Sequence, residues 1–167
     1  TTYTWTSPVI SPLGSITGGS ALAGQTSISQ VLNNITGANG TATYTVTPSA
    51  GTCTGTSFTI AVTVNPIPTL TSTLTPTAIC SNTTFNYTPA SNTTGSILSW
   101  TRSVVTGISN AGASGLNNPA ETLVNITSQA LSVPYVYTIT TPNGCSTTQP
   151  VTVAVTPSPS LTSGLTP

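Results

Sequence analysis

The stretch Thr43-Tyr44-Thr45-Val46-Thr47 decides the fold class, because its side chains alternate between hydroxyl and apolar types with a period of two. Such alternation is typical of a half-buried β-strand. The pattern recurs at residues 58–64, 135–140 and 151–155. Threonine suits the solvent face of a strand, since its β-branched side chain fits the pleat and its hydroxyl stays hydrated. No long run shows a capped helical period, so the sequence predicts an all-β fold.

Charge is almost absent from the 167-residue chain. Arg102 is its basic residue and Glu121 its acidic one, histidine is missing, and charged residues make up 1% of the sequence, against roughly 25% in an ordinary soluble domain. The chain instead contains 39 threonines and 22 serines. Phosphate binding needs several basic residues, calcium binding needs clustered carboxylates, and catalytic triads and most zinc sites need histidine. We therefore expect no enzyme, no cofactor, no metal site and no nucleic-acid partner.

The hydrophobic content indicates a folded chain. Hydrophobic residues make up 36%, mean hydropathy is +0.22 and the net charge is zero, whereas disordered chains combine low hydrophobicity with high net charge. A membrane span needs about 20 mostly apolar residues, and the apolar runs here, such as residues 60–62, are interrupted by threonine or serine. No signal peptide is visible and the sequence does not begin with methionine. We expect a fragment or a mature segment without a membrane span.

The chain repeats itself. Residues 66–76, PIPTLTSTLTP, return as residues 157–167, PSPSLTSGLTP, with eight identities in eleven positions and an offset of 91. Further framework residues follow in order at slowly drifting offsets: Cys53 with Cys145, Tyr44 with Tyr137, and Trp5 with Trp100. Short loop insertions produce such a drift between homologous repeats. The sequence therefore predicts two consecutive copies of one unit.

The repeat also suggests an explanation for the odd cysteine count. In the second copy Cys80 precedes the tryptophan and Cys145 lies near the end, whereas the first copy contains only the later cysteine, Cys53. We expect a Cys80–Cys145 disulfide, with Cys53 unpaired because its partner would precede residue 1. The alternative, Cys53–Cys80, would link neighbouring copies. Disulfides indicate an oxidising, extracellular setting.

The second copy resembles a known family of extracellular repeats. The resemblance rests on ICSNTTFNYTP (residues 79–89), SWTR (99–102), ETLVN (121–125), YVYTI (135–139) and the stretch from NGC at 143–145 to VTVAVTP at 151–157. These motifs resemble the PKD-like, immunoglobulin-like tandem repeats of very large secreted surface proteins from Bacteroidota. That group includes gliding-motility adhesins exported by the type IX secretion system.

This resemblance implies a tandem of Ig-like β-sandwich repeats joined by Pro-rich linkers. Residues 1–66 are expected to form a repeat that lacks its first strands, and residues 67–77 a linker. Residues 78–157 are expected to form a complete repeat, and residues 158–167 a linker or the start of the next one. Proline favours extended geometry, so the linkers would be semi-rigid spacers.

Individual residues are expected to have structural roles. Arg102 and Glu121 are expected to pair across strands, although the first copy has Ser7 where Arg102 would lie and no glutamate matching Glu121. Asn-X-Thr sequons are expected to arise from composition and to remain mostly unused in a bacterium; they lie at Asn34, Asn39, Asn82, Asn86, Asn92 and Asn125. In an Ig-like sandwich a central tryptophan packs in the core more often than it binds sugar. The predicted core aromatics are Trp5, Trp100, Tyr44 and Tyr137.

The expected function is that of a structural repeat in a long extracellular or cell-surface filament or adhesin stalk. Its partners would be neighbouring repeats of the same chain, with lateral self-association favoured by the absence of charge repulsion, and surface glycans. The alternative is a carbohydrate-binding module of a secreted polysaccharide-degrading protein. Ice binding, suggested by Thr-X-Thr runs such as residues 43–45 and 71–73, is disfavoured because those runs are irregularly spaced.

Overall fold

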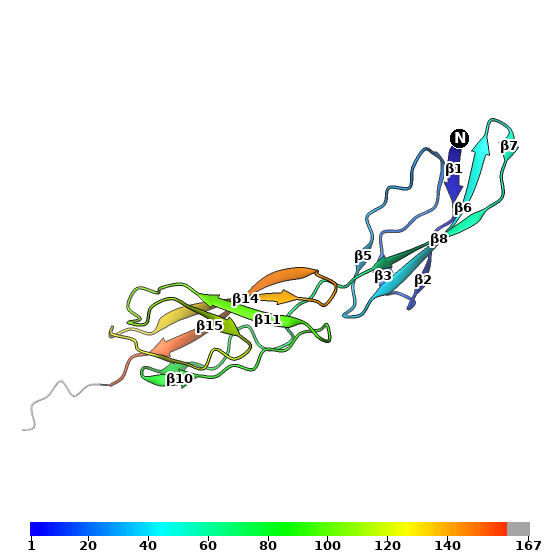
Figure 1. The fold of residues 1–167 in the computed structure, drawn as a ribbon. Coiled ribbons are helices and arrows are strands. Elements are labelled where there is room, and N and C mark those ends of the chain that lie inside the picture. The colour runs from blue at the N-terminus through cyan, green and yellow to red at the C-terminus, as the bar shows by residue number, and fades with distance from the viewer. Residues whose placement is uncertain (160–167) are drawn as a thin grey trace, which may run out of the picture. The chain divides into compact units, whose positions relative to one another are not determined.

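The computed structural model describes residues 1–159 and contains no helix in that range. It divides into two compact units, Thr1–Ile67 and Pro68–Pro167, both visible in Figure 1. Strands and turns make up both units as far as they are described, which confirms the predicted all-β fold. Among the described residues no helix could cross a membrane.

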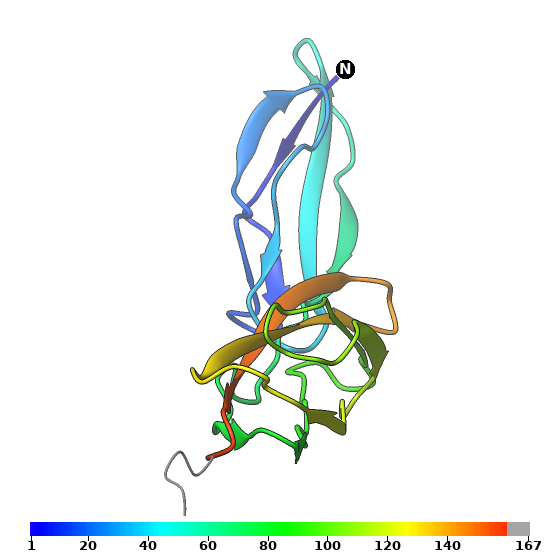
Figure 2. The same ribbon diagram turned by 90° about the vertical axis from the view of Figure 1, so that its left-hand side faces the viewer.

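The first unit is organised around its longest strand, β6. On one side β6 pairs with β1 and β2, and on the other with β7 and β8; β4 extends the sheet beyond β1, and β3 pairs with β5. Figure 2 shows β6 in cyan running beside the blue-green β8. The strands are β1 (Thr2–Trp5), β2 (Val9–Ser11), β3 (Ile16–Thr17), β4 (Leu22–Gln25), β5 (Asn33–Asn34), β6 (Gly40–Ala50), β7 (Cys53–Thr54) and β8 (Phe58–Val64).

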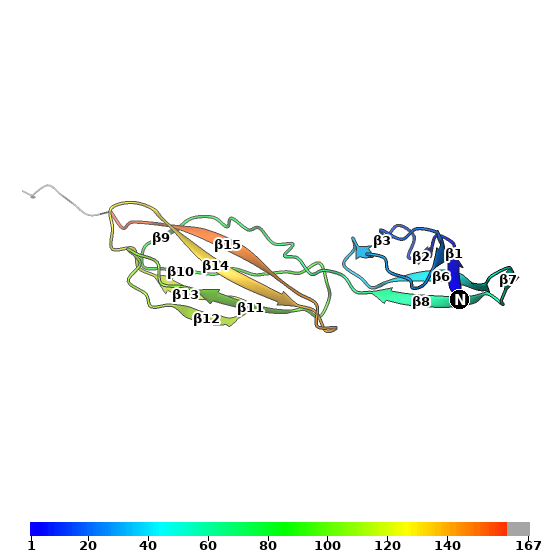
Figure 3. The ribbon, with the colours of Figure 1, turned by 90° about the horizontal axis from the view of Figure 1, so that it is seen from above.

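The second unit is a β-sandwich. Its larger sheet has the order β12-β11-β14-β15-β9, in which β9 runs parallel to β15 and the other pairs are antiparallel. The smaller sheet, β10 with β13, covers the larger one, and the Phe85 ring of β10 lies 5.1 Å from the Tyr135 ring of β14 (Figure 3). The strands are β9 (Ile79–Cys80), β10 (Thr83–Phe85), β11 (Ile97–Arg102), β12 (Ala113–Leu116), β13 (Glu121–Leu123), β14 (Leu131–Thr140) and β15 (Ser146–Thr156).

The period-two pattern accounts for both cores. Along β14 and β15 the alternate apolar residues are buried while their neighbours are exposed or half-buried. The buried residues of the first unit are fewer: Trp5, Ile16, Ala42, Tyr44 and Val46. Those of the second unit are Leu70, Phe85, Tyr87, Leu98, Trp100, Ile108, Leu123, Val133, Tyr135, Tyr137, Ile139, Val151, Val153 and Val155.

In the second half of each unit, residues at equivalent positions in the strand register are 91 apart in the sequence. Tyr44 lies opposite Ile60 in the first unit, as Tyr135 lies opposite Val151 in the second. Tyr44 is therefore the counterpart of Tyr135, and its predicted alignment with Tyr137 is wrong. The two tryptophans do correspond. Trp5 lies opposite Val46 and Trp100 lies opposite Tyr137, and Tyr137 is the residue 91 positions after Val46.

The stretch expected to be a free spacer, residues 67–77, is packed against the second unit over much of its length. Leu70 is buried in the core, and its backbone N–H donates to the Gln149 side chain. Thr147 donates to the Pro68 carbonyl, and the Thr152 backbone N–H donates to the Leu74 carbonyl at 2.9 Å. The linker prediction is therefore wrong for residues 68–74, because their apolar side chains and carbonyls complete the open edge of β15. Of the other expected linker, residues 158–167, residues 160–167 lie outside the described residues.

The cysteines lie too far apart for the expected disulfide. Cys80 pairs with Thr156 at the end of β15, whereas Cys145 directly precedes Ser146 at its beginning. A strand of this length spans about 33 Å, and bridged Cα atoms lie within about 7 Å of each other. Cys53, Cys80 and Cys145 all have free thiols. The predicted Cys80–Cys145 disulfide is wrong, and the alternative Cys53–Cys80 pair is not formed.

Candidate functional site

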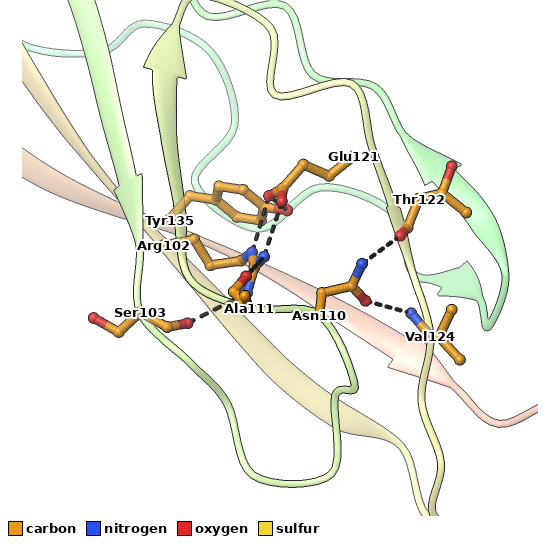
Figure 4. Close-up of polar contacts among 8 residues, drawn as sticks. All are labelled: Arg102, Ser103, Asn110, Ala111, Glu121, Thr122, Val124 and Tyr135. Carbon is orange, nitrogen blue, oxygen red and sulfur yellow. Dashed lines mark hydrogen bonds and ion pairs between the residues drawn. The ribbon is translucent and has the colours of Figure 1, made fainter.

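Arg102 and Glu121 form an ion pair inside the second unit (Figure 4). Arg102 Nε donates to Glu121 Oε2 at 2.9 Å, and Nη2 donates to Oε1 at 2.8 Å. The Arg102 side chain has no exposed surface, and that of Glu121 is 16% exposed. Two such bonds hold the planar guanidinium in a fixed orientation against the carboxylate. The one basic and the one acidic side chain of the sequence are thus paired with each other.

The position of Arg102 lets it connect three segments. It is the last residue of β11, and Glu121 is the first residue of β13 in the smaller sheet. Arg102 Nη2 also donates to the Ala111 carbonyl at 2.6 Å, and Nη1 donates to the Ser103 carbonyl at 3.4 Å. The guanidinium therefore ties the end of β11 to the loop before β12 and to the facing layer.

Tyr135 of β14 completes this network by donating its hydroxyl proton to Glu121 Oε2 at 2.8 Å. Burial alone would raise the pKa of Glu121, but hydrogen bonds from Arg102 and Tyr135 outweigh it and hold that pKa below its usual value. The hydrogen bond to Glu121 raises the pKa of Arg102. Burial, with a smaller contribution from Glu121, raises the pKa of Tyr135. At neutral pH the pair is ionised and the tyrosine is neutral.

Asn110 braces the neighbouring backbone in the same region (Figure 4). Its Nδ2 donates to the Thr122 carbonyl at 2.9 Å, and its Oδ1 accepts from the Val124 N–H at 2.9 Å. Because one carboxamide satisfies both a donor and an acceptor, the loop before β12 is fastened along β13.

The first unit builds the corresponding network without charge. Gln30, 91 residues before Glu121, accepts the Tyr44 hydroxyl bond at 2.7 Å through Oε1. Its Nε2 donates to the Ser20 carbonyl at 2.7 Å, and Ser20 lies 91 residues before Ala111. One glutamine side chain therefore makes contacts that require both Glu121 and Arg102 in the second unit. Sequence reasoning missed Gln30, although the constant offset of 91 would have found it.

The indole N–H groups of the two tryptophans differ in their hydrogen bonding, because the two units build this network from different residues. Trp5 Nε1 donates to the Ser20 carbonyl at 3.0 Å. In the second unit the equivalent carbonyl, that of Ala111, accepts from Arg102 instead, and the buried Trp100 Nε1 has no partner among the described residues. Gly115 lies directly against the Trp100 ring, where a Cβ would come within 2.9 Å of Cζ2.

A second matched pair is formed by Asn34 and Asn125, both in Asn-Ile-Thr triplets and both buried. Asn125 Nδ2 donates to the carbonyls of Gln129 and Val155 at 2.7 and 2.8 Å, while Oδ1 accepts from the backbone N–H and hydroxyl of Thr127. Asn34 makes the same four bonds, to residues 36, 38 and 64. These asparagines join a turn to the last strand of each unit, and their nitrogens face inward. The recurrence of the triplet at an offset of 91 was the available sequence signal.

The structure places the four expected core aromatics inside the units. Trp5 is 2% exposed and Trp100 5%, while Tyr44 and Tyr137 are almost fully buried. Tyr137 donates to the Asn117 carbonyl at 2.8 Å, and its ring lies 5.5 Å from that of Tyr87. Burial raises the pKa values of Tyr44 and Tyr137. A buried indole cannot stack on a sugar ring.

The chemistry of these groups is that of internal bracing. The polar atoms of the Arg102 network are directed at backbone carbonyls and at each other. No group of three His, Cys, Asp or Glu residues that could hold a metal occurs in residues 1–159. The arrangement fixes two layers of a sandwich and a loop.

A family model described as a PKD-like domain matches residues 1–68 and again residues 77–159. The two matched ranges correspond closely to the two units. No curated protein and no solved structure matches the chain.

Proposed function

The chain belongs to the PKD-like domain family, and on that premise we propose that it is a non-catalytic structural repeat of a long extracellular filament or adhesin stalk. Domains of this Ig-like kind are generally non-catalytic and often occur in extracellular proteins. Two such domains in immediate succession give a short sample of an array. Spacing a distal part of the protein away from the cell would be the task of that array.

The observation that carries the proposal is the repeated internal brace. Tyr44 with Gln30, and Tyr135 with Glu121, hold the layers at the same place in both units. A catalytic group has to reach a substrate, whereas the Arg102 side chain has no exposed surface and that of Glu121 is 16% exposed. What the two units have in common is a means of mechanical cohesion.

The surface composition supports the same role. Serine and threonine occupy many of the exposed strand positions, where charged residues are absent. Adhesion between copies would therefore be insensitive to salt concentration and to changes of pH around neutrality. The absence of charge repulsion favours lateral self-association along exposed strand edges. We include such bundling, and contacts with neighbouring repeats, in the proposal.

The finer setting that we propose follows from the motif resemblance: large secreted surface proteins of Bacteroidota, of the gliding-motility adhesin type, exported by type IX secretion. A carbohydrate-binding role, the alternative, would need a surface other than Trp5 and Trp100, because both are buried.

Immunogold electron microscopy tests the proposal on intact cells that produce the protein. Antibodies raised against the chain should label filaments outside the cell envelope without permeabilisation, with an antibody to a cytoplasmic protein as the control. Label that appears only after permeabilisation would overturn the proposal. Hydrolytic activity of the purified chain that Glu121→Gln abolishes would overturn it as well.

A further inference from the structure

The first segment of the second unit runs in the same direction as the last strand of that unit, β15. We call residues 68–81 the leading segment. Its contacts with β15 advance together along both partners, from Pro68 with Thr147 to Cys80 with Thr156. Further contacts are backbone bonds, side-chain bonds and parallel strand pairing, and they join Leu70 with Gln149, Leu74 with Thr152, Ile79 with Val155 and Thr156, and Ser81 with Thr156. The two segments are therefore parallel over most of the length of β15.

The chain enters and leaves the second unit at opposite ends of β15. Pro68 contacts Thr147, the second residue of that strand, and Thr156 is its last residue. A strand rises about 3.3 Å per residue, so these two points lie about 30 Å apart. Tension on the chain from both sides turns the unit until the two points lie along the pull. It then draws the leading segment one way and β15 the other way, along the strand axis.

Hydrogen bonds between parallel segments that are pulled in this way share the load. Because the pull runs along the strands, no bond opens until one segment slides past the other, and the bonds have to yield together. A pull that separated the two segments from one end would break the same bonds one after another. Unfolding under force is governed by the unfolding rate, so the shared load makes the unit slow to open along this axis.

The leading segment is also fastened to the rest of the sandwich. In its first half, the Thr73 carbonyl accepts the hydroxyl proton of the buried Tyr87 at 3.0 Å. At its end, Ser81 Oγ accepts from the Asn125 N–H at 2.9 Å, while Asn125 Nδ2 donates to the Val155 carbonyl of β15 at 2.8 Å. Asn125 therefore holds both the leading segment and β15 where the chain leaves the unit.

We propose that the leading segment and β15 form a shear clamp, through which the second unit carries tension along the chain. Thr147, Gln149 and Thr152 hold the clamp where the chain enters, and the pairing of β9 with the end of β15 holds it where the chain leaves. The inference rests on the proposed function, because a unit within a filament is pulled from both sides. It deepens that function by naming the residues that bear the load.

Single-molecule force spectroscopy of the whole chain tests the clamp by pulling along two axes. Cys53→Ser and Cys80→Ser, at exposed positions, leave Cys145 as the thiol for a handle. One set of molecules is pulled from the two chain ends, which loads the clamp in shear, and unfolding of residues 68–156 should then lengthen the chain by roughly 280 Å. The other set is pulled from the N-terminal end and Cys145, beside the start of β15. This second axis should lose the high-force event of the second unit, whereas the event of the first unit, loaded alike on both axes, should stay unchanged.

A matched pair of substitutions tests one bond of the clamp. Thr147→Val removes the hydroxyl that donates to the Pro68 carbonyl, and it should speed unfolding along the shear axis by roughly tenfold, the equivalent of about 1.4 kcal/mol. Thr148→Val, at the neighbouring exposed position, should leave that rate unchanged. An unfolding force that is the same on both axes, or equal rates for the two variants, would overturn the clamp. Neither result bears on surface localisation, which the immunogold experiment tests separately.

Discussion

Gln30 in the first unit and Glu121 in the second accept the same hydrogen bond, from Tyr44 at 2.7 Å and from Tyr135 at 2.8 Å. The two residues are 91 positions apart and solve one problem in two ways. The carboxylate needs Arg102 to balance its buried charge, whereas the carboxamide supplies its own donor. The brace therefore belongs to the fold, and the ion pair is one version of it.

Replacing Arg102 with alanine should destabilise the second unit by about 3 to 5 kcal/mol, because Glu121 would be left largely buried without its counter-charge. Urea unfolding of the whole chain, followed by hydrogen exchange of the β14 amides, measures the loss. Thr101→Ala, at an exposed position of the same strand, should change stability by less than about 0.5 kcal/mol. An equal effect of both variants would contradict a role for the buried pair.

The uncharged network of the first unit should also work in the second unit. Arg102→Ser alone leaves a buried unpaired carboxylate, but adding Glu121→Gln removes that charge and retains an acceptor for Tyr135 and a donor for the Ala111 carbonyl. We expect the double variant to regain about 2 kcal/mol relative to the single one. A double-mutant cycle on unfolding free energies measures this coupling. Additive effects of the two substitutions would show that the networks are not equivalent.

The stability of the chain should decrease in acid through Glu121. Its folded pKa lies below the usual value, so its contribution is complete above the unfolded pKa of about 4.3 and is lost as pH falls through the folded pKa. Urea midpoints measured from pH 7 downward should be flat at first and fall below about pH 5. Because Glu121 is the only Asp or Glu in the sequence, Glu121→Gln should remove most of this slope.

The extent of correct sequence prediction follows from what side-chain periodicity encodes. Alternation at residues 43–47 and 135–140 predicts strands and their buried faces, because the strand period is local. The predicted Cys80–Cys145 disulfide was wrong because aligning two repeats gives equivalent positions along the chain and does not give the distance between the two ends of a strand. Gln30 was missed because aligning Tyr44 with Tyr137 shifted the second half of the unit by two residues. Residues 68–74 were mistaken for a spacer because the strand edge they cover lies some 80 residues further along the sequence.

All three cysteines should react as free thiols in the native chain. Cys53 and Cys80 are exposed and Cys145 is half-buried, so a maleimide reagent should label all three without prior reduction, Cys145 most slowly. Mass spectrometry of the non-reduced digest should contain no peptide that links Cys80 to Cys145. Such a linked peptide from protein prepared without oxidant would contradict the strand register of β9 and β15.

Asn34 and Asn125 should be essential for the stability of their units, although both lie in sequons. Asn125→Ala would leave the carbonyls of Gln129 and Val155 without their donor, at a cost of about 2 to 4 kcal/mol, and Asn34→Ala should affect the first unit similarly. Ile126→Ala, at a 70% exposed position between Asn125 and Thr127, is the matched control. Unfolding free energies with hydrogen exchange of β15 and β8 amides separate the two units. Each Nδ2 donates inward to a carbonyl of the last strand. An N-glycan on Asn34 or Asn125 of the folded protein would therefore contradict these hydrogen bonds.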